Sequence, residues 1–171
     1  MRVPTRQFLR KKLNANEQRV VDDVREFGCH VSFIFDPDGE VPDFCYSIGF
    51  TQSVAQPEVI VFGLRQELMH SMVNEVHRQC ADGLKLSDGL PIGGLLEGYD
   101  CILGHVVDAA AIEEHFGWAI WYYRSQHKVE LTEAFQIVWP GAQQGKFPWD
   151  AGCDPEIIAI QPALYQSRLY S

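Results

Sequence analysis

The sequence predicts a single α+β domain with a mixed, largely antiparallel sheet of five or six strands, packed by two or three helices. Short alternating or continuous apolar segments recur at strand length, and longer segments repeat apolar residues at helical spacing. The chain has 171 residues, of which 46% are hydrophobic, so it suffices for one domain with a substantial core. We therefore expect residues 14–171 to form one globular domain.

The first third of the chain predicts a helix followed by a hairpin. Asn14 and Glu17 have the spacing of a capping box, apolar residues follow at helical spacing, and Gly28 supplies a C-terminal stop. Residues 30–35 and 44–49 flank the turn sequence DPDG. These two segments predict an antiparallel hairpin with a long loop.

The middle of the chain predicts a buried strand, a long helix and a further strand. Residues 59–62 form a short unbroken apolar run between a proline and a glycine, which indicates a central strand covered on both faces. An apolar stripe over residues 68–80 predicts a helix that ends at the next glycine. We expect the glycine-rich residues 84–98 to form a loop and residues 99–107 to form a strand.

The last third predicts one more helix and two more strands. Asp108 is placed to cap a third long helix that continues to Tyr123. Residues 135–139 alternate in the manner of a strand with one face more deeply buried, so the indole of Trp139 is expected to point inward. Residues 156–161 lie between two prolines and are expected to form an edge strand.

Charge is distributed unevenly along the chain. The first 12 residues contain five Lys or Arg and no acidic residue, whereas the rest contains nine basic and 23 acidic residues. We expect residues 1–13 to be a flexible, solvated basic segment. The acidic body disfavours nucleic acid and favours either solubility or a basic protein partner. Because no apolar run approaches about 20 residues and no secretory signal is present, we expect no membrane association and a cytoplasmic location.

Motifs for cofactors and metals are not found in the sequence. The five cysteines are scattered and include no C-x-x-C pair, so they indicate reduced, buried thiols. No H-E-x-x-H, G-x-S-x-G, Walker or G-x-G-x-x-G pattern is present. We therefore expect no catalytic motif, no bound metal and no cofactor.

The most particular segment of the chain is FQIVWPGAQQGKFPW, residues 135–149. Pro140 ends the predicted strand, Gly145 permits a turn, and Pro148 fixes the backbone before Trp149. Two indoles are thereby placed around a polar loop. Each indole either fills the core or anchors a ligand or partner.

Three motifs in order resemble a known family. They are YSIGF at residues 46–50, PEVIVFGL at residues 57–64, and QIVWP with GKFPW between residues 136 and 149. Together they are similar to the bacterial domain-of-unknown-function family numbered 4262, over roughly residues 27–152. This resemblance implies a small bacterial α+β domain and no established reaction. Gln56 and Gly141 stand where that family often has His and Asp, which disfavours chemistry that depends on those two side chains.

Several polar side chains within these motifs are poor core residues and are the candidate binding residues. A carboxylate at Glu58, at the mouth of a buried strand, must reach water, cap backbone N–H groups or pair with a cation such as Lys146. An internal brace of this kind is favoured over general-base chemistry, because no second carboxylate or His lies beside Glu58 in sequence. The candidate binding set is Tyr46, Glu58, Gln136, Lys146, Trp149 and Asp150.

Two classes of function remain open. The first is a non-catalytic binding module, such as an acidic immunity or antitoxin-like protein that captures a basic protein partner with aromatic anchors. The second is an enzyme or small-molecule-binding domain. Its pocket would open between the strand of Tyr46, the turn at Glu58 and the loop of residues 139–149.

Overall fold

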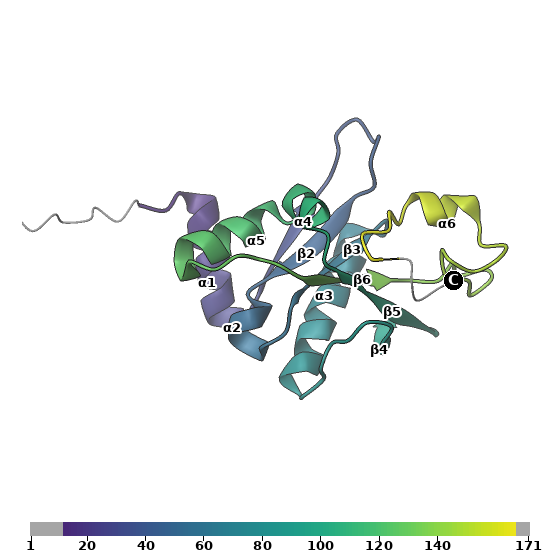
Figure 1. The fold of residues 1–171 in the computed structure, drawn as a ribbon, viewed down its shortest axis with the longest axis horizontal. Coiled ribbons are helices and arrows are strands. Elements are labelled where there is room, and N and C mark those ends of the chain that lie inside the picture. The colour runs from purple at the N-terminus through teal and green to yellow at the C-terminus, as the bar shows by residue number, and fades with distance from the viewer. Residues whose placement is uncertain (1–11, 167–171) are drawn as a thin grey trace, which may run out of the picture.

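The computed structural model of the protein describes residues 12–166, so most of the predicted basic segment, residues 1–11, lies outside the described residues. Figure 1 shows one sheet with helices on both of its faces. The elements in chain order are α1 (Ala15–Phe27), β1 (His30–Ile34), β2 (Phe44–Ile48), α2 (Phe50–Val54), β3 (Glu58–Phe62), α3 (Gln66–Ala81), β4 (Pro91–Leu96), β5 (Tyr99–Val106), α4 (Ala109–His115), α5 (Gly117–Tyr122), the π-helix η1 (Tyr123–His127), β6 (Ala134–Val138) and α6 (Pro155–Ala159).

The sheet has six strands in the order β1-β2-β3-β6-β5-β4. All neighbouring pairs are antiparallel except β3 and β6, which run parallel at the centre with Glu58 opposite Ala134. The predicted mixed, largely antiparallel sheet of five or six strands is confirmed. Because β3 and β6 are parallel, the segments that precede them lie at one end of the sheet, and the segments that follow them lie at the other.

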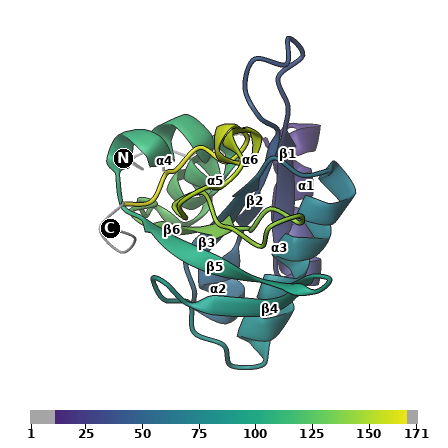
Figure 2. The ribbon, with the colours of Figure 1, turned by 90° about the vertical axis from the view of Figure 1, so that its right-hand side faces the viewer.

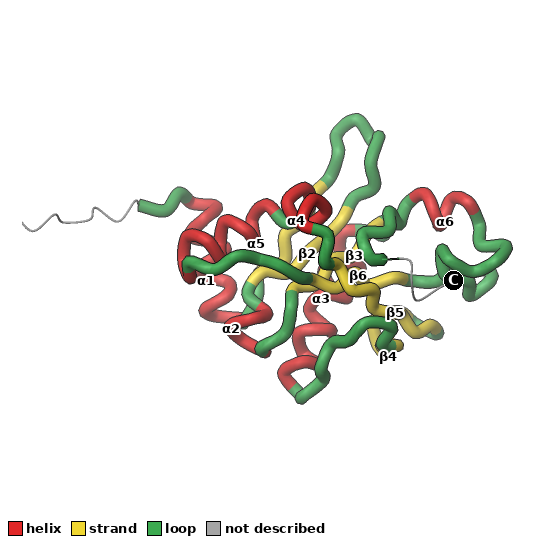
Figure 3. The backbone as a smooth tube through the Cα atoms, in the orientation of Figure 1, coloured by secondary structure: helices red, strands yellow, loops and turns green. Residues whose placement is uncertain are grey.

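Both faces of the sheet are covered by helices, as Figures 1 and 3 show. Val59 and Val61 belong to the core that packs against α3, whereas Ile60 and Phe62 belong to the core shared with α1, α4 and α5. All five residues of β3 and all five of β6 are buried. A central strand at residues 59–62 is thus confirmed, while the single more deeply buried face predicted for β6 is wrong, because helices cover both of its sides.

Local signals determine the N-terminal elements as predicted. The side chain of Asn14 accepts a hydrogen bond from the backbone of Glu17, and Gly28 ends α1 in the left-handed region at φ 86°. The hairpin of β1 and β2 is present, and its loop projects from the body of the molecule in Figure 2.

Three predicted elements are wrong. The residues 84–98 predicted as a loop contain β4, which buries Ile92 and Leu95 and has an irregular register against β5. The third long helix is divided into α4, α5 and η1, since the helix is interrupted at Phe116 before Gly117. The predicted edge strand at residues 156–161 is the short helix α6, because Asp154 accepts from the backbone N–H of Glu156 and Pro155 suits a first helical turn.

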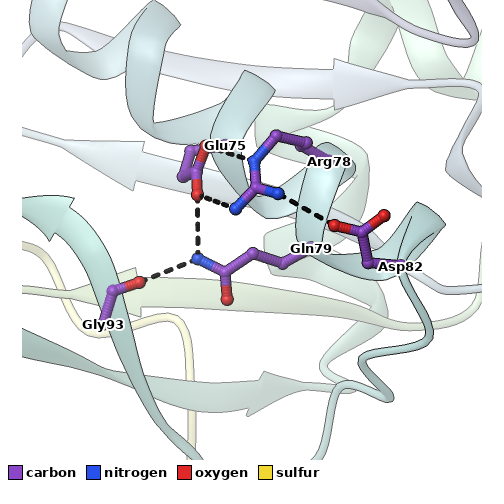
Figure 4. Close-up of polar contacts among 5 residues, drawn as sticks. All are labelled: Glu75, Arg78, Gln79, Asp82 and Gly93. Atoms are coloured by element: carbon purple, nitrogen blue, oxygen red, sulfur yellow. Dashed lines mark hydrogen bonds and ion pairs between the residues drawn. The ribbon is translucent and has the colours of Figure 1, made fainter.

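A polar cluster on α3 connects this helix to the edge of the sheet (Figure 4). Arg78 binds Glu75 at 2.7 Å and Asp82 at 2.8 Å, and both carboxylates lie on the same helix. The Gln79 amide donates to the carbonyl of Gly93 in β4 at 2.8 Å. Every charge of the cluster has a partner within it, so the cluster serves to attach β4 to α3.

Candidate functional site

The carboxyl group of Glu58 is fully buried at the first position of β3. Ser47 Oγ donates to Oε2 at 2.5 Å. The backbone N–H groups of Gly49 and Phe50 donate to Oε1 at 2.9 Å each, and the hydroxyl of Tyr123 donates to the same oxygen. We call these five residues the Glu58 cluster. It satisfies the carboxyl group with four donors from two segments of the chain, residues 47–50 and Tyr123.

Burial and hydrogen bonding act in opposite directions on this carboxyl group. Burial raises the pKa of Glu58 above its ordinary value, and the hydrogen bonds from Ser47, Tyr123 and the two backbone N–H groups oppose that rise. Three donors converge on Oε1 and one on Oε2. When Glu58 is protonated, the proton therefore belongs on Oε2, and the Ser47 hydroxyl then accepts this hydrogen bond instead of donating it. Burial also raises the pKa of Tyr123, so this phenol remains a donor.

The YSIGF motif supplies the backbone half of the cluster. Gly49 has φ 105°, and a Cβ at this position would lie 2.7 Å from Val24 Cγ1. Only glycine satisfies both constraints. The conformation of Gly49 turns two successive N–H groups toward Glu58 and begins α2 directly after β2.

A pocket of about 430 Å³ opens beside the Glu58 cluster. Its lining comes from α2 and the residues after it, from Tyr123 at the start of η1, and from the segment before β6. No Lys, Arg or His lines it among the residues that the structure describes. We call it the acidic pocket, and it is lined by Thr51, Ala55, Gln56, Pro57, Tyr123, Val129, Glu130, Leu131, Thr132 and Glu133.

Unusual backbone conformations border the acidic pocket. Ala55 and Lys128 have φ 55° and φ 53°, and within residues 12–166 they are the two non-glycine residues with positive φ. Ala55 lines the pocket and Lys128 directly precedes a lining residue. Tyr123 begins the π-helix η1. Left-handed non-glycine residues and π-helical turns are both enriched at functional sites.

The two carboxylates at the rim of the acidic pocket are held by neighbouring basic side chains. Glu130 binds Arg124 through both of its oxygens, each at 3.0 Å from Nε. Glu133 lies 2.8 Å from Nε2 of His105. The side chains of Glu130 and Glu133 are 63% and 50% exposed, so each retains access to solvent and to a ligand.

Tyr46 and Gln136, two of the predicted binding residues, are buried structural groups. The hydroxyl of Tyr46 accepts from the backbone N–H of Trp118 at 2.9 Å and so positions α5. The Gln136 side chain donates to the carbonyl of Pro162 and accepts from the N–H of Leu164, both at 2.9 Å. Gln136 thereby holds the C-terminal segment against the centre of the sheet.

The three predicted residues after β6 form a local structure of their own. Lys146 Nζ donates to the carbonyl of Ala151 at 2.9 Å, and the carboxylate of Asp150 accepts from the N–H of Phe147 at 2.8 Å. Trp149 stacks on Phe147, with ring centroids 5.0 Å apart and planes at 2°. These contacts order the loop and engage Lys146 within it.

The structure does not bring the six predicted residues together. Glu58 begins β3, whereas Lys146, Trp149 and Asp150 follow β6, and these are opposite ends of a parallel pair (Figure 1). The predicted brace at Glu58 does exist as backbone N–H capping, but Lys146 takes no role in it. A pocket that joins Glu58 to the loop of residues 139–149 is therefore not formed.

A family model for a domain of unknown function, DUF4262, matches residues 23–154. The chain belongs to this family. The DUF4262 match includes the whole Glu58 cluster and the acidic pocket, whereas Gln161 and Leu164, which contact β6 or the residue after it, lie beyond it. No curated protein and no solved structure matches the chain.

Gln56, where sequence reasoning placed a frequent histidine of DUF4262, has a structural role. Its side-chain oxygen accepts from the backbone N–H of Leu86 at 2.8 Å, and its amide nitrogen donates to the carbonyl of Ala55 at 2.9 Å. Both contacts hold the chain between α2 and β3. In this member of DUF4262 the position therefore supplies no acid or base.

Two residues that shape this site are not predicted from the sequence: Tyr123 of the Glu58 cluster and Thr51 of the acidic pocket. Tyr123 was assigned to the apolar side of a helix, and nothing in the local sequence marks it as a partner of Glu58. Thr51 lies two residues after Gly49, within a five-residue helix too short for a periodic signal. The YSIGF motif does not reveal these contacts, because Tyr123 and Glu58 are 65 positions apart and the N–H groups of Gly49 and Phe50 face Glu58 only through the left-handed conformation of Gly49.

A serine and a histidine also meet beside α2. Ser53 Oγ lies 2.6 Å from the carbonyl of Gly28 and 2.9 Å from His77 Nε2. A hydroxyl has one proton, and the carbonyl can only accept, so the N–H belongs to His77 Nε2. Burial lowers the pKa of His77, and its Nε2 has no lone pair directed at Ser53. The pair fastens α2 to α1 and α3 and lacks the geometry of a nucleophile with its base.

Residues 12–166 contain no group of three or more His, Cys, Asp or Glu side chains arranged to hold a metal ion. Within the same residues, every helix is too short or too polar to cross a membrane. The five cysteines are free and buried, and burial raises the pKa of the Cys29 thiol to about 12.

Proposed function

We propose that the protein is a non-catalytic binding domain whose acidic pocket holds a positively charged group of its ligand. The observation that carries this proposal is the composition of the pocket wall. Glu130 and Glu133 lie at its rim, the Glu58 carboxyl group lies behind Tyr123, and no basic side chain of the described chain lines it. A volume of about 430 Å³ accommodates a lysine or arginine head group or a small amine.

A binding role, rather than catalysis, is supported by the internal hydrogen bonds of the Glu58 cluster and of Ser53. Each polar atom of the Glu58 cluster already has a partner inside the protein, and Tyr123 is 2% exposed. The Ser53 hydroxyl donates to a backbone carbonyl. General acid or base chemistry requires a group that reaches the substrate with a free proton or lone pair. The cluster is better suited to keep the pocket wall rigid.

The charged group belongs, we infer, to a basic protein partner. The chain has a net charge of −9, which attracts basic proteins over long range and speeds their association. An immunity or antitoxin-like protein works in this way, by covering a basic surface. Five free thiols suit a reducing, cytoplasmic compartment for this role. The alternative ligand is a small amine, which would place the same kind of positively charged group in the acidic pocket.

Calorimetric titration distinguishes a basic protein partner from a small amine. The full chain is titrated with a hexa-arginine peptide and, separately, with L-arginine amide. The variant Glu130→Gln/Glu133→Gln removes two negative charges from the pocket. The control Glu97→Gln/Glu114→Gln removes two exposed negative charges elsewhere. We expect the peptide to bind the wild type and the control alike, and the pocket variant about tenfold more weakly.

Each outcome decides between the proposals. Equal weakening by the pocket and control variants would mean that only net charge matters, and the pocket would be rejected. Binding of L-arginine amide at the pocket with no gain for the peptide would favour a small amine over a protein partner. If neither probe binds, the proposed function is wrong.

A further inference from the structure

A second pocket lies on the other side of α2 and η1 and has the opposite chemical character. Its volume is about 460 Å³. Arg25 and His127 line it, and among the described residues no Asp or Glu does so. We call it the basic pocket, and it is lined by Val21, Val24, Arg25, Gly28, Gln52, Ser53, Tyr122, Gln126 and His127.

Two consecutive tyrosines separate the two pockets. Tyr123 lines the acidic pocket and Tyr122 lines the basic pocket. Both are buried at the junction between α5 and η1. In a chain of net charge −9, a pocket wall without a carboxylate is a local departure from the prevailing charge. Such a wall favours an anion that the remaining surface repels.

Two carbonyl groups near the C-terminal end of α1, which would repel an anion if they were free, are occupied. The carbonyl of Val24 accepts from the N–H of Gly28 at 3.0 Å, and the carbonyl of Gly28 accepts from Ser53 Oγ at 2.6 Å. The negative end of this helix is thus partly neutralised within the protein. What the pocket offers a ligand is mainly hydrogen-bond donors.

The hydrogen-bond donors of the basic pocket come from three elements, α1, α2 and η1. The Arg25 side chain is 76% exposed and has only a distant contact, 3.9 Å, to the carboxylate of Asp22. Its guanidinium group is free to bind an oxyanion through two N–H groups. Gln52 and Gln126 add amide N–H groups. His127 lies 3.1 Å from the Tyr122 hydroxyl through Nε2, which leaves its Nδ1 for a ligand.

From this arrangement we propose that the basic pocket is a binding site for an oxyanion, a carboxylate or phosphate group, held by Arg25 and His127 with the amides of Gln52 and Gln126. This site is separate from the acidic pocket and does not depend on the proposed function. Carboxylate and phosphate present the same oxygen acceptors to the guanidinium group, and the probes distinguish them.

The test is calorimetric titration of the full chain with inorganic phosphate and with citrate. Arg25→Gln and His127→Gln each remove one basic side chain from the pocket. Arg19→Gln is the matched control, because Arg19 is an exposed arginine of the same helix that does not line the basic pocket. We expect saturable binding of one anion, weakened about tenfold by each pocket variant and unchanged by the control.

The preferred probe identifies the oxyanion, since tighter binding of citrate indicates a carboxylate and tighter binding of phosphate indicates a phosphate group. The ring signals of His127 in NMR spectra should shift during the same titration, and the melting temperature of each variant verifies folding. The proposal is overturned if neither anion saturates, if Arg19→Gln weakens binding equally, or if the His127 signals do not move. Glu130→Gln/Glu133→Gln should leave anion affinity unchanged, which keeps this test distinct from that of the acidic pocket.

Discussion

Ser47 and Glu58 share a short hydrogen bond between the ends of two adjacent strands. Ser47 Oγ donates to Glu58 Oε2 at 2.5 Å and accepts from the backbone N–H of Val59 at 2.9 Å. One hydroxyl thus satisfies both a buried carboxyl group and the N–H of the next residue in β3. The contact connects β2 to β3 beyond their last paired residues, Tyr46 and Ile60, and places the Glu58 cluster at that end of the sheet.

The variant Glu58→Gln should change how stability depends on pH. The pKa of Glu58 is raised by burial in the folded protein, whereas in the unfolded chain it is near its ordinary value of 4.5. The folded state therefore keeps this proton at pH values where the unfolded state has lost it. The stabilisation is fully present below pH 4.5 and is lost as pH rises through the folded pKa.

The quantity to follow is the free energy of unfolding of the wild type minus that of Glu58→Gln. We expect this difference to decrease as pH rises above 4.5. Urea denaturation of both proteins at a series of pH values gives this difference. Comparing the two proteins cancels the effects of the other carboxylates. A difference that is constant with pH, or that increases, would contradict a raised pKa.

Tyr123→Phe should destabilise the protein by about 1–3 kcal/mol, because the buried Glu58 carboxyl group loses one of its donors. Tyr122→Phe is the control. It removes a hydroxyl from the adjacent residue, whose bond is to the exposed His127, so its cost should be smaller. Chemical denaturation of both variants checks the order. Equal costs would mean that the bond to Glu58 adds nothing to stability.

Trp139→Ala should destabilise the protein by about 3–5 kcal/mol through loss of buried contacts and formation of a cavity. The Trp139 side chain is 5% exposed and its indole donates to the carbonyl of Phe62 at 2.8 Å. Trp149→Ala, in the half-buried loop, should cost less. Thermal or urea unfolding midpoints decide this, and a larger loss for Trp149 would show that the loop contributes more to the core than its burial indicates.

Ala55→Gly should stabilise the protein or leave its stability unchanged. Ala55 has φ 55°, a conformation that costs an alanine about 1–2 kcal/mol and that glycine adopts freely, while the greater freedom of glycine in the unfolded chain offsets about 0.4–1 kcal/mol. Ala110→Gly, inside α4, should instead cost about 1 kcal/mol. If Ala55→Gly is as destabilising as Ala110→Gly in urea denaturation, the strain at Ala55 is absent.

Local elements were predicted best where a single segment contains its own signals. The capping of α1 by Asn14, its end at Gly28 and the hairpin of β1 and β2 each depend on residues close in sequence. The prediction failed where a distant strand partner decides, or where one local signal outweighs another. β4 forms in a glycine-rich segment because β5 pairs with it, and α6 replaces an expected strand because capping by Asp154 outweighs a short apolar run.

In the candidate site, too, the features that depend on local sequence were predicted and those that depend on distant residues were not. Glu58 was selected because a carboxylate at the start of a buried strand requires partners, and backbone N–H capping was one of the expected solutions. Pairing with Lys146, another of the expected solutions, does not occur, because the parallel arrangement of β3 and β6 places that lysine at the other end of the sheet. Tyr123 and the two pockets have no signature in the sequence, since they arise from segments far apart in the chain.

The sequence by itself determined the fold class, the acidic charge, most of the elements and the family membership, because periodicity, capping residues and motifs are properties of short segments. Only the tertiary structure decided which side chains meet. The order of the strands sets Glu58 beside Ser47 and Tyr123, and places α2 and η1 between a pocket with carboxylates and a pocket without them. Burial and proximity, which give a charged side chain its chemistry, exist only after the chain has folded.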